Sequence, residues 1–182
     1  KANVSVRINP DIDAHTHKYV TTGLYENKFG ISQHEFEKLI DILNKSEHIN
    51  FIGLHFHIGS QITRVEEVFS LECKRVNEIV AYFERNGLKI NNINLGGGLG
   101  VDYDDPDGTP IADFETWFST IAGNIVRRED QQVHVEPGRS LVAHCATLIS
   151  RVLFVKSGET KNFLIMDAGM NDLIRPALYG AY

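Results

Sequence analysis

Three short groups of residues that could bind a ligand or do chemistry follow three apolar, strand-like runs of the sequence. They are the histidine-containing group 55–61, the glycine run 96–100 and the Glu-Pro-Gly-Arg group 136–139. In a (β/α)n scaffold, the loops after the strands build the active site at one rim of the sheet. The three groups would therefore meet there, and the sequence indicates part of an enzyme.

The glycine run and the Glu-Pro-Gly-Arg group together favour a phosphate or carboxylate site. Gly97 and Gly98 let the backbone approach a ligand without a Cβ in the way and can present amide groups to an anion. Alone, the glycines fit a tight turn equally well. The next strand, however, ends in Gly138 and Arg139, and a guanidinium fork beside bare backbone suits phosphate.

Glu136 and two histidines each admit several roles. Glu136 could pair with Arg139 or Arg7, or it could keep the ring nitrogen of pyridoxal phosphate (PLP) protonated, which makes that cofactor an electron sink. His55 and His57 point to one side of their strand. His57 could be a core histidine, a stacking partner for a flat cofactor, or with His55 half of a metal site. No second cluster of ligands for a metal appears, so metal is not favoured.

Near the end of the chain, Arg175 and Tyr179 stand four residues apart after the last strand-like run. They could belong to an ordinary surface loop. If they reach the rim of the sheet, a guanidinium and a phenol would suit the carboxylate of a substrate.

The composition fits a water-soluble enzyme. Of 182 residues, 42% are hydrophobic, and 18 Lys and Arg against 24 Asp and Glu give a net charge of −6. This charge argues against a surface built for nucleic acid or membranes. Cys73 and Cys145 lack the spacing of metal ligands or of a disulfide framework, so a cytoplasmic setting is expected. No signal peptide or membrane-spanning run is visible.

Strand-like and helical patterns alternate over the first 140 or so residues, which predicts an α/β fold with a parallel sheet. Ser32 and Glu35 have the spacing of a capping box, and Thr109 with Pro110 suits a helix start. The 11–31 segment has no clear periodicity and is a candidate lid. The expected strands are 4–9, 51–58, 90–95 and 133–135, and the expected helices are 33–46, 65–85 and 110–125.

From about residue 141 the pattern changes to two strand-like runs, 145–155 and 162–166, joined by a turn. We therefore expect two domains, 1–142 and 143–182, the second being the beginning of an antiparallel β domain. A complete (β/α)₈ barrel takes about 250 residues, so the first domain would be half of one. The chain is expected to be an internal piece of a longer enzyme.

The motifs resemble those of the alanine-racemase-like (fold type III) PLP enzymes. The groups 55–61, 96–98 and 136–139 are shared with a wider set that includes ornithine and arginine decarboxylases. Three further segments resemble the diaminopimelate decarboxylase branch itself. They are 14–19 with Thr22 and Gly23, 28–31, and 167–179.

The resemblance implies the C-terminal half of a PLP-binding TIM-type barrel, from a cytoplasmic homodimer that makes L-lysine and CO₂ from meso-2,6-diaminopimelate. It implies that His57 stacks on the PLP ring, that Glu136 pairs with the pyridine nitrogen, and that the 11–31 segment closes over the site. The residues implied to hold the phosphate are Ser60, Gly97, Gly98 and Arg139, beside Gly138, and those implied to bind substrate are Arg139, Arg175 and Tyr179.

Two catalytic groups of that family have no counterpart in the sequence. None of the nine lysines ends an expected strand, and Lys28 is the only one inside a family motif. Cys73 and Cys145 lie in the wrong contexts for the family's catalytic cysteine, which comes from the partner subunit. The segment is therefore expected to be inactive alone.

Three alternatives stay open at this point. The first is a sister decarboxylase of ornithine, arginine or carboxynorspermidine, which would need an acidic distal pocket, whereas Arg175 points to a distal carboxylate. The second is a non-catalytic PLP-binding barrel, which would have no need of a β domain. The third is a metal hydrolase that uses His55 and His57.

Overall fold

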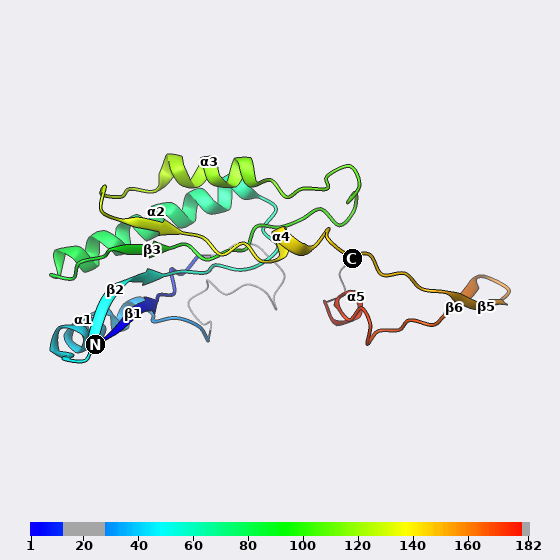
Figure 1. Cartoon of the computed structure of the whole chain (residues 1–182), viewed down its shortest axis with the longest axis horizontal. Coiled ribbons are helices and arrows are strands. Elements are labelled where there is room, and N and C mark those ends of the chain that lie inside the picture. Colours follow the sequence, from blue (N-terminus) through cyan, green and yellow to red (C-terminus); the bar gives the residue numbers. More distant parts are fainter. Residues whose placement is uncertain (13–27, 180–182) are drawn as a thin grey trace.

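The computed structural model describes residues 1–12 and 28–179, and its main body is a four-stranded parallel sheet (Figure 1). The strands pair in the order in which they occur in the chain. Leu54 lies opposite Ile93, and Ile93 opposite Val133. The predicted α/β fold is therefore confirmed. The strands are β1 (Ala2–Arg7), β2 (Ile49–His55), β3 (Asn92–Asn94) and β4 (Gln132–His134).

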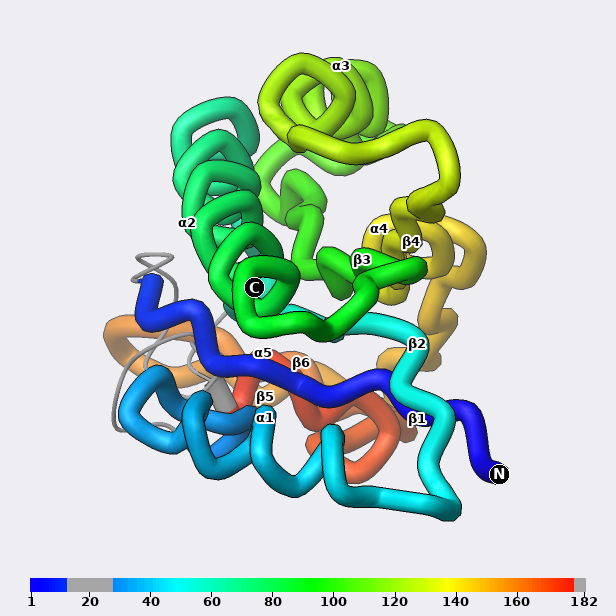
Figure 2. The backbone as a smooth tube through the Cα atoms, turned by 90° about the vertical axis from the view of Figure 1, so that its left-hand side faces the viewer, coloured from blue at the N-terminus to red at the C-terminus, as the bar shows by residue number. Residues whose placement is uncertain are grey.

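Helices connect consecutive strands, as parallel pairing requires. They are the 3₁₀ turn η1 (Gln33–Glu35) with α1 (Phe36–Lys45), then α2 (Val65–Arg85) and α3 (Phe114–Asn124). Aromatic contacts join them in sequence. The ring of Phe36 lies 5.0 Å from that of Phe83, and Phe69 lies 5.6 Å from Trp117. Figure 2 shows α2 and α3 side by side along the sheet.

At the end of β2 and just beyond it, alternate residues face the core and the rim of the sheet. Leu54, Phe56 and Ile58 are fully buried, while the intervening His55 and His57 are only partly buried. Because alternate residues of an extended chain point to opposite sides, burial of the apolar set leaves the two histidines on the other side. The core therefore fixes the side to which both imidazoles point.

Of two predicted helix starts, the one at residue 33 has the predicted position without the predicted capping bond, and the one at Thr109 and Pro110 is wrong. The Ser32 side chain makes no capping hydrogen bond, and the chain passes through η1 before α1. The third helix begins at Phe114, where Asp113 Oδ1 accepts a bond from Thr116 N at 3.0 Å. Thr109 instead donates its hydroxyl to the Asp105 carbonyl at 2.9 Å, within a turn. The turn thus uses the group that was expected to cap the helix.

The two short helices were not predicted. α4 (Arg139–Val142) follows β4 directly, and α5 (Arg175–Tyr179) ends the described chain. The nearby glycine and proline residues suggested loops at both places. Arg139 is the first residue of α4 and Arg175 the first of α5, so each guanidinium projects from the beginning of a helical turn.

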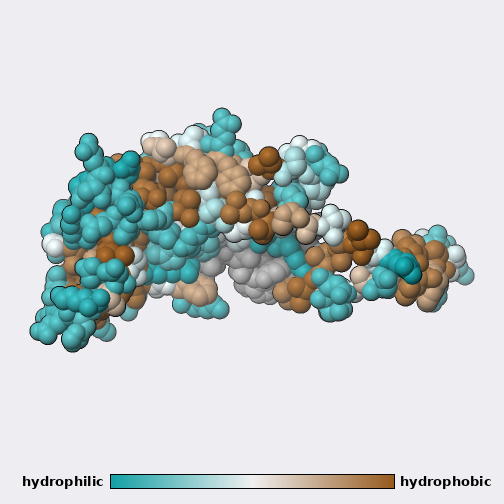
Figure 3. Space-filling view, viewed as in Figure 1, coloured by the Kyte–Doolittle hydropathy of each residue, from teal (hydrophilic) through white to brown (hydrophobic). Residues whose placement is uncertain are grey.

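An antiparallel hairpin of β5 (Val152–Ser157) and β6 (Asn162–Met166) lies at the far end of the molecule from the amino terminus (Figure 1). The second predicted strand is confirmed, and the first begins at Val152 rather than at 145. Apolar side chains are exposed over this hairpin (Figure 3). They include Val152, Leu153, Phe154, Val155, Phe163 and Leu164.

Part of the predicted lid cannot be compared with the structure. The motif residues 14–19 with Thr22 and Gly23, and most of the 11–31 segment, lie outside the described residues. The described end of this segment pairs with the sheet, since Ile31 forms a bridge with Ile8. Within residues 1–12 and 28–179, no helix has the length and apolar character needed to cross a membrane.

Candidate active site

The carboxyl ends of β2 and β3 bring two polar side chains, His55 and Asn94, to Glu136 beyond the end of β4. Asn94 Nδ2 donates to Glu136 Oε1 at 2.8 Å, and His55 Nε2 lies 3.5 Å from Glu136 Oε2. In the described part of the chain Glu136 forms no ion pair with Arg7 or Arg139: Arg7 stacks over the Phe29 ring at 4.9 Å and acts on Glu136 only by its charge, and Arg139 bonds Ser60. The Glu136 side chain is about half exposed, so its carboxylate is oriented by neighbours and still accessible to a ligand.

The imidazole of His57 lies beside the glycine run. Gly97 N donates to His57 Nδ1 at 3.2 Å, which places the proton of a neutral ring on Nε2. Burial, and then the positive charge of Arg7, lower the pKa of His57. Burial likewise lowers the pKa of His55, so both rings are neutral near pH 7. The site thus holds a flat, uncharged aromatic surface next to a carboxylate.

Gly97 and Gly98 are required by the close approach of neighbouring loops. A Cβ on Gly97 would lie 2.1 Å from the Glu136 carbonyl oxygen, and a Cβ on Gly98 would lie 2.5 Å from that of Gly59. Gly98 also has a φ of +107°, which side chains disfavour. Gly138 differs, since a Cβ there would meet nothing within 4 Å. The first two glycines therefore hold three loops together.

Arg139 connects the loops after β2, β3 and β4. Its Nη2 donates to Ser60 Oγ at 3.0 Å, while its Nη1 donates to Gln61 Oε1 at 3.3 Å and lies 3.5 Å from the Tyr103 hydroxyl. A guanidinium and a hydroxyl at this spacing are phosphate or carboxylate ligands. The sequence analysis did not identify Gln61 or Tyr103 as contributors. Gln61 stands at the end of the 55–61 group, which was a usable signal, whereas Tyr103 carried none.

Arg175 reaches the same neighbourhood from the other end of the chain. Its guanidinium lies 4.8 Å from the centroid of the Tyr103 ring, within the range of a cation–π contact. Arg175, Tyr103 and Gln61 all line a cavity of about 600 Å³. The Tyr179 side chain lies outside the described atoms, so its predicted place beside Arg175 stays a prediction.

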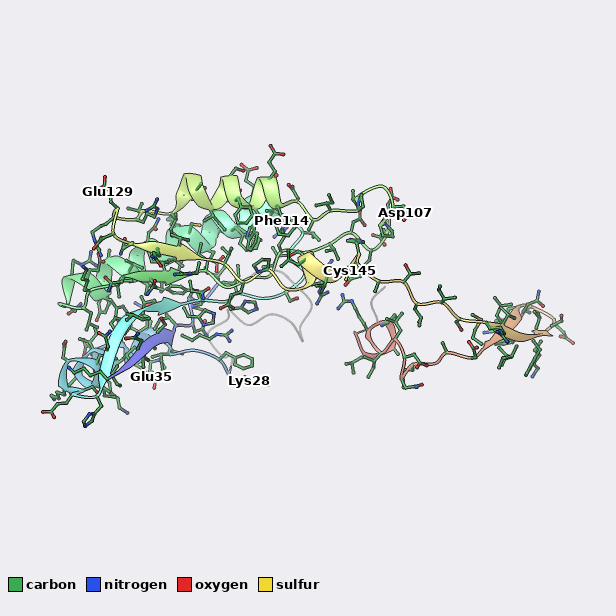
Figure 4. All side chains as sticks on the ribbon, viewed as in Figure 1. Lys28, Glu35, Asp107, Phe114, Glu129 and Cys145 are labelled. Atoms are coloured by element: carbon green, nitrogen blue, oxygen red, sulfur yellow. The ribbon has the colours of Figure 1, made fainter. Side chains whose placement is uncertain are left out.

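Neither the cysteines nor Lys28 takes part in the hydrogen bonds that join Glu136 and Arg139 to their neighbours. Cys73 is buried in α2, where burial and the neighbouring Glu72 raise the pKa of its thiol to about 12. Cys145 is exposed just after α4, and Lys28 stands over the Phe29 ring at 5.0 Å (Figure 4). Both cysteines are free thiols, and no group of three or more metal-ligating side chains occurs in the described part of the chain.

The arrangement suits a flat molecule that has an anionic end and a basic ring nitrogen. Arg139 and Ser60 supply donors for the anion, Glu136 supplies a carboxylate, and His57 supplies a neutral ring between them. These side chains come from the segments after β2 and β4, and the glycine run after β3, the strand between them, supplies the backbone N–H that bonds His57.

Comparison with known proteins gives consistent matches. The family model described as pyridoxal-dependent decarboxylase, pyridoxal binding domain, matches residues 1–143. A diaminopimelate decarboxylase from Bacteroides thetaiotaomicron is 51% identical over 181 residues, which cover 100% of this chain and 47% of that protein. The chain thus spans about half the length of the curated relatives it matches.

Solved structures extend the likeness to three dimensions. A mutant of the diaminopimelate decarboxylase from Helicobacter pylori, complexed with L-lysine, matches with a TM-score of 0.87 and 38% identity, covering 100% of this chain and 44% of that one. The Paramecium bursaria Chlorella virus arginine decarboxylase, bound to agmatine, matches with a TM-score of 0.77 at 22% identity, covering 96% and 44%. The latter likeness concerns the fold alone.

Proposed function

Because the chain belongs to the pyridoxal-dependent decarboxylase family through its pyridoxal binding domain, we propose that the polypeptide carrying it converts meso-2,6-diaminopimelate to L-lysine and CO₂. The relatives that support this substrate match over the whole chain. The observation that carries the proposal is the convergence of His57, from the segment after β2, with Glu136 and Arg139, from the segment after β4, on one rim of the sheet.

The residues at this rim fit PLP, the cofactor of the family. Ser60 and Arg139 offer hydroxyl and guanidinium donors to a phosphate, and the absence of a Cβ at Gly97 and Gly98 lets the strand-end loops close together. Glu136 offers a carboxylate to a pyridine nitrogen. The proposed cofactor-binding set is His57, Ser60, Gly97, Gly98, Glu136, Gly138 and Arg139.

Two of these side chains would act during the reaction. When bound, PLP supplies an electron sink for the pair left behind by departing CO₂. Glu136 would hold a proton on the ring nitrogen, and the bond from Asn94 keeps one carboxylate oxygen in place for that task. His57, being neutral, would press an uncharged ring against the cofactor and exclude water without competing for its positive charge.

Substrate recognition is proposed to involve Arg139, Arg175 and Tyr179. A guanidinium is the preferred partner of a carboxylate because it donates two parallel hydrogen bonds. Diaminopimelate carries a carboxylate at each end, whereas ornithine and arginine carry a cation at the distal end. Arg175 beside the cavity therefore favours diaminopimelate over these sister substrates.

We further propose that residues 1–142 are the last four βα units of a TIM-type barrel and that 143–182 begin a β domain. The parallel order of β1 to β4, the family match over residues 1–143 and the antiparallel hairpin support this division. None of the described lysines stands at the carboxyl end of a strand of the parallel sheet, so the lysine that carries PLP is proposed to lie elsewhere in the polypeptide. The whole enzyme is proposed to be a cytoplasmic homodimer with shared active sites.

The test is CO₂ release by the complete polypeptide with added PLP, offered meso-diaminopimelate, ornithine, arginine and lysine in turn. Turnover confined to diaminopimelate is expected. Arg175→Ala should raise the KM for diaminopimelate, while Arg151→Ala, at an exposed arginine of the hairpin region, should not. Turnover of ornithine or arginine instead would contradict the substrate assignment, and no turnover of any of the four would contradict the decarboxylase assignment.

A further inference from the structure

Gln61 has a backbone conformation that glutamine rarely adopts. Its φ is +61°, and it is one of two non-glycine residues with positive φ among those that the structure describes. Such a conformation is maintained only where surrounding contacts impose it, and such residues concentrate at functional sites. Here the next residue imposes it, because Ile62 N donates to the Gly98 carbonyl and Ile62 O accepts from Gly100 N, both at 2.9 Å.

The side chain of Gln61 is fixed at both ends of its amide. Nε2 donates to the Val101 carbonyl at 2.5 Å, and Oε1 accepts from Val101 N at 3.3 Å. Oε1 also accepts from Arg139 Nη1 at 3.3 Å. Turning the amide over would set its NH₂ group against the guanidinium and against another N–H, so only one orientation satisfies all three contacts.

We propose that Gln61 is a positioning residue that fixes the Arg139 guanidinium for the phosphate of PLP. This inference rests on the proposed function, because it assumes that Arg139 binds that phosphate. A long arginine side chain loses considerable rotational freedom when it binds a ligand. With Gln61 present, the Arg139 side chain would already have lost this rotational freedom in the folded protein, so that less is lost when the ligand binds. Its remaining N–H donors would stay beside Ser60.

The charge pattern supports a positioning role over a direct one. Gln61 presents an acceptor to Arg139, and an acceptor repels phosphate oxygens. One of its two amide N–H groups donates to the Val101 carbonyl, which turns the NH₂ end toward the backbone. The amide can therefore hold Arg139 without competing with it for the anion. A carboxylate at this position would instead neutralise the positive charge of Arg139.

The experiment compares two probes on the complete polypeptide: PLP, and pyridoxal, which lacks the phosphate. Equilibrium binding would be measured for the unchanged protein, for Gln61→Met and for Gln61→Gly, with Gln132→Met, at an exposed glutamine of β4, as the matched control. Each Gln61 variant should bind PLP about tenfold more weakly, the usual effect of losing one hydrogen bond to a charged group. Pyridoxal affinity should be unchanged in both, and Gln132→Met should change neither.

The glycine variant separates positioning from folding. Glycine adopts a positive φ without strain, so Gln61→Gly should keep or raise the thermal midpoint while still losing PLP affinity. In an Arg139→Gln background, Gln61→Met should cause little further loss, since the two residues act as a unit. Equal weakening of PLP and pyridoxal would overturn the inference.

The remaining outcomes distinguish the inference from the function on which it rests. If Arg139→Gln weakens PLP binding and neither Gln61 variant does, Gln61 has no positioning role and the proposed function stands. If Arg139→Gln leaves PLP binding unchanged, Arg139 does not bind the phosphate, and the inference falls together with that part of the proposed function.

Discussion

Replacement of Glu72 should make the stability of the protein less dependent on pH. Glu72 lies in α2 with 0% of its surface exposed, and neither carboxyl oxygen has a hydrogen-bond partner within the part of the chain that the structure describes. Burial raises the pKa of this carboxyl well above its ordinary value. The group is thus neutral in the folded protein under conditions in which the unfolded chain has already released its proton.

The sign of the effect follows from proton binding. Below the ordinary glutamate pKa both states are protonated, and Glu72 imposes no pH-dependent penalty. As the pH rises above that value, the free energy of unfolding should fall by up to about 1.4 kcal/mol per pH unit, until the pH passes the raised pKa of the folded state. Glu72→Gln removes this titration. Glu72→Leu also removes the unpartnered polar group, which should add about 2 kcal/mol of stability.

Urea unfolding of the complete polypeptide at several pH values between 5 and 8 measures this effect. The unchanged protein should lose stability across the range relative to Glu72→Gln. The control is Glu66→Gln on the same helix, where the carboxylate is exposed and the slope should persist. If the unchanged protein and Glu72→Gln show parallel pH dependence, Glu72 is not held neutral and the reasoning fails.

Three further predictions concern the rim of the sheet. Glu136→Gln in the complete polypeptide should lower decarboxylation at least about 100-fold with PLP still bound, whereas Glu129→Gln, at an exposed position, should not; retained activity would contradict the role of Glu136. Gly97→Ala should destabilise the fold by about 2 kcal/mol, because its Cβ would meet a carbonyl oxygen. Gly123→Ala in α3, where the space is open, should instead stabilise the fold by about 0.5–1 kcal/mol. Thermal unfolding of the two variants tests this, and equal effects of both would contradict it. Nitrogen-15 NMR should find His57 still neutral below pH 6.5, since burial lowers its pKa; a midpoint at or above 6.5 would contradict this.

The strands were predictable because each of them is a short run of mainly apolar residues that becomes buried in the sheet. Leu54, Phe56 and Ile58 alternate with the histidines, and this alternation fixes both the core and the rim. The helix starts were less predictable, because a cap depends on which partner a hydroxyl finds. Thr109 finds the Asp105 carbonyl in its own turn, and no local pattern distinguishes that outcome from a cap.

The candidate site was predictable where a side chain stands next to a glycine or a proline at a strand end. Glu136, Arg139 and Ser60 are of this kind. Asn94 and Gln61 were missed, because their contacts cross from one strand or loop to another. Asn94 pairs in register with His134, two residues before Glu136, so knowledge of the register would have indicated Asn94. The sequence alone carries no register between strands so far apart in the chain.

The order of the strands has a kinetic consequence. Within this sheet each strand pairs with the next one in the sequence, so each pairing closes a loop of only roughly 40 residues. Each βα unit can add to the one made before it as the chain leaves the ribosome, as β2 adds to β1. The rim would then be assembled one loop at a time, with Arg139 arriving after the loops that follow β2 and β3, and Arg175 arriving later still.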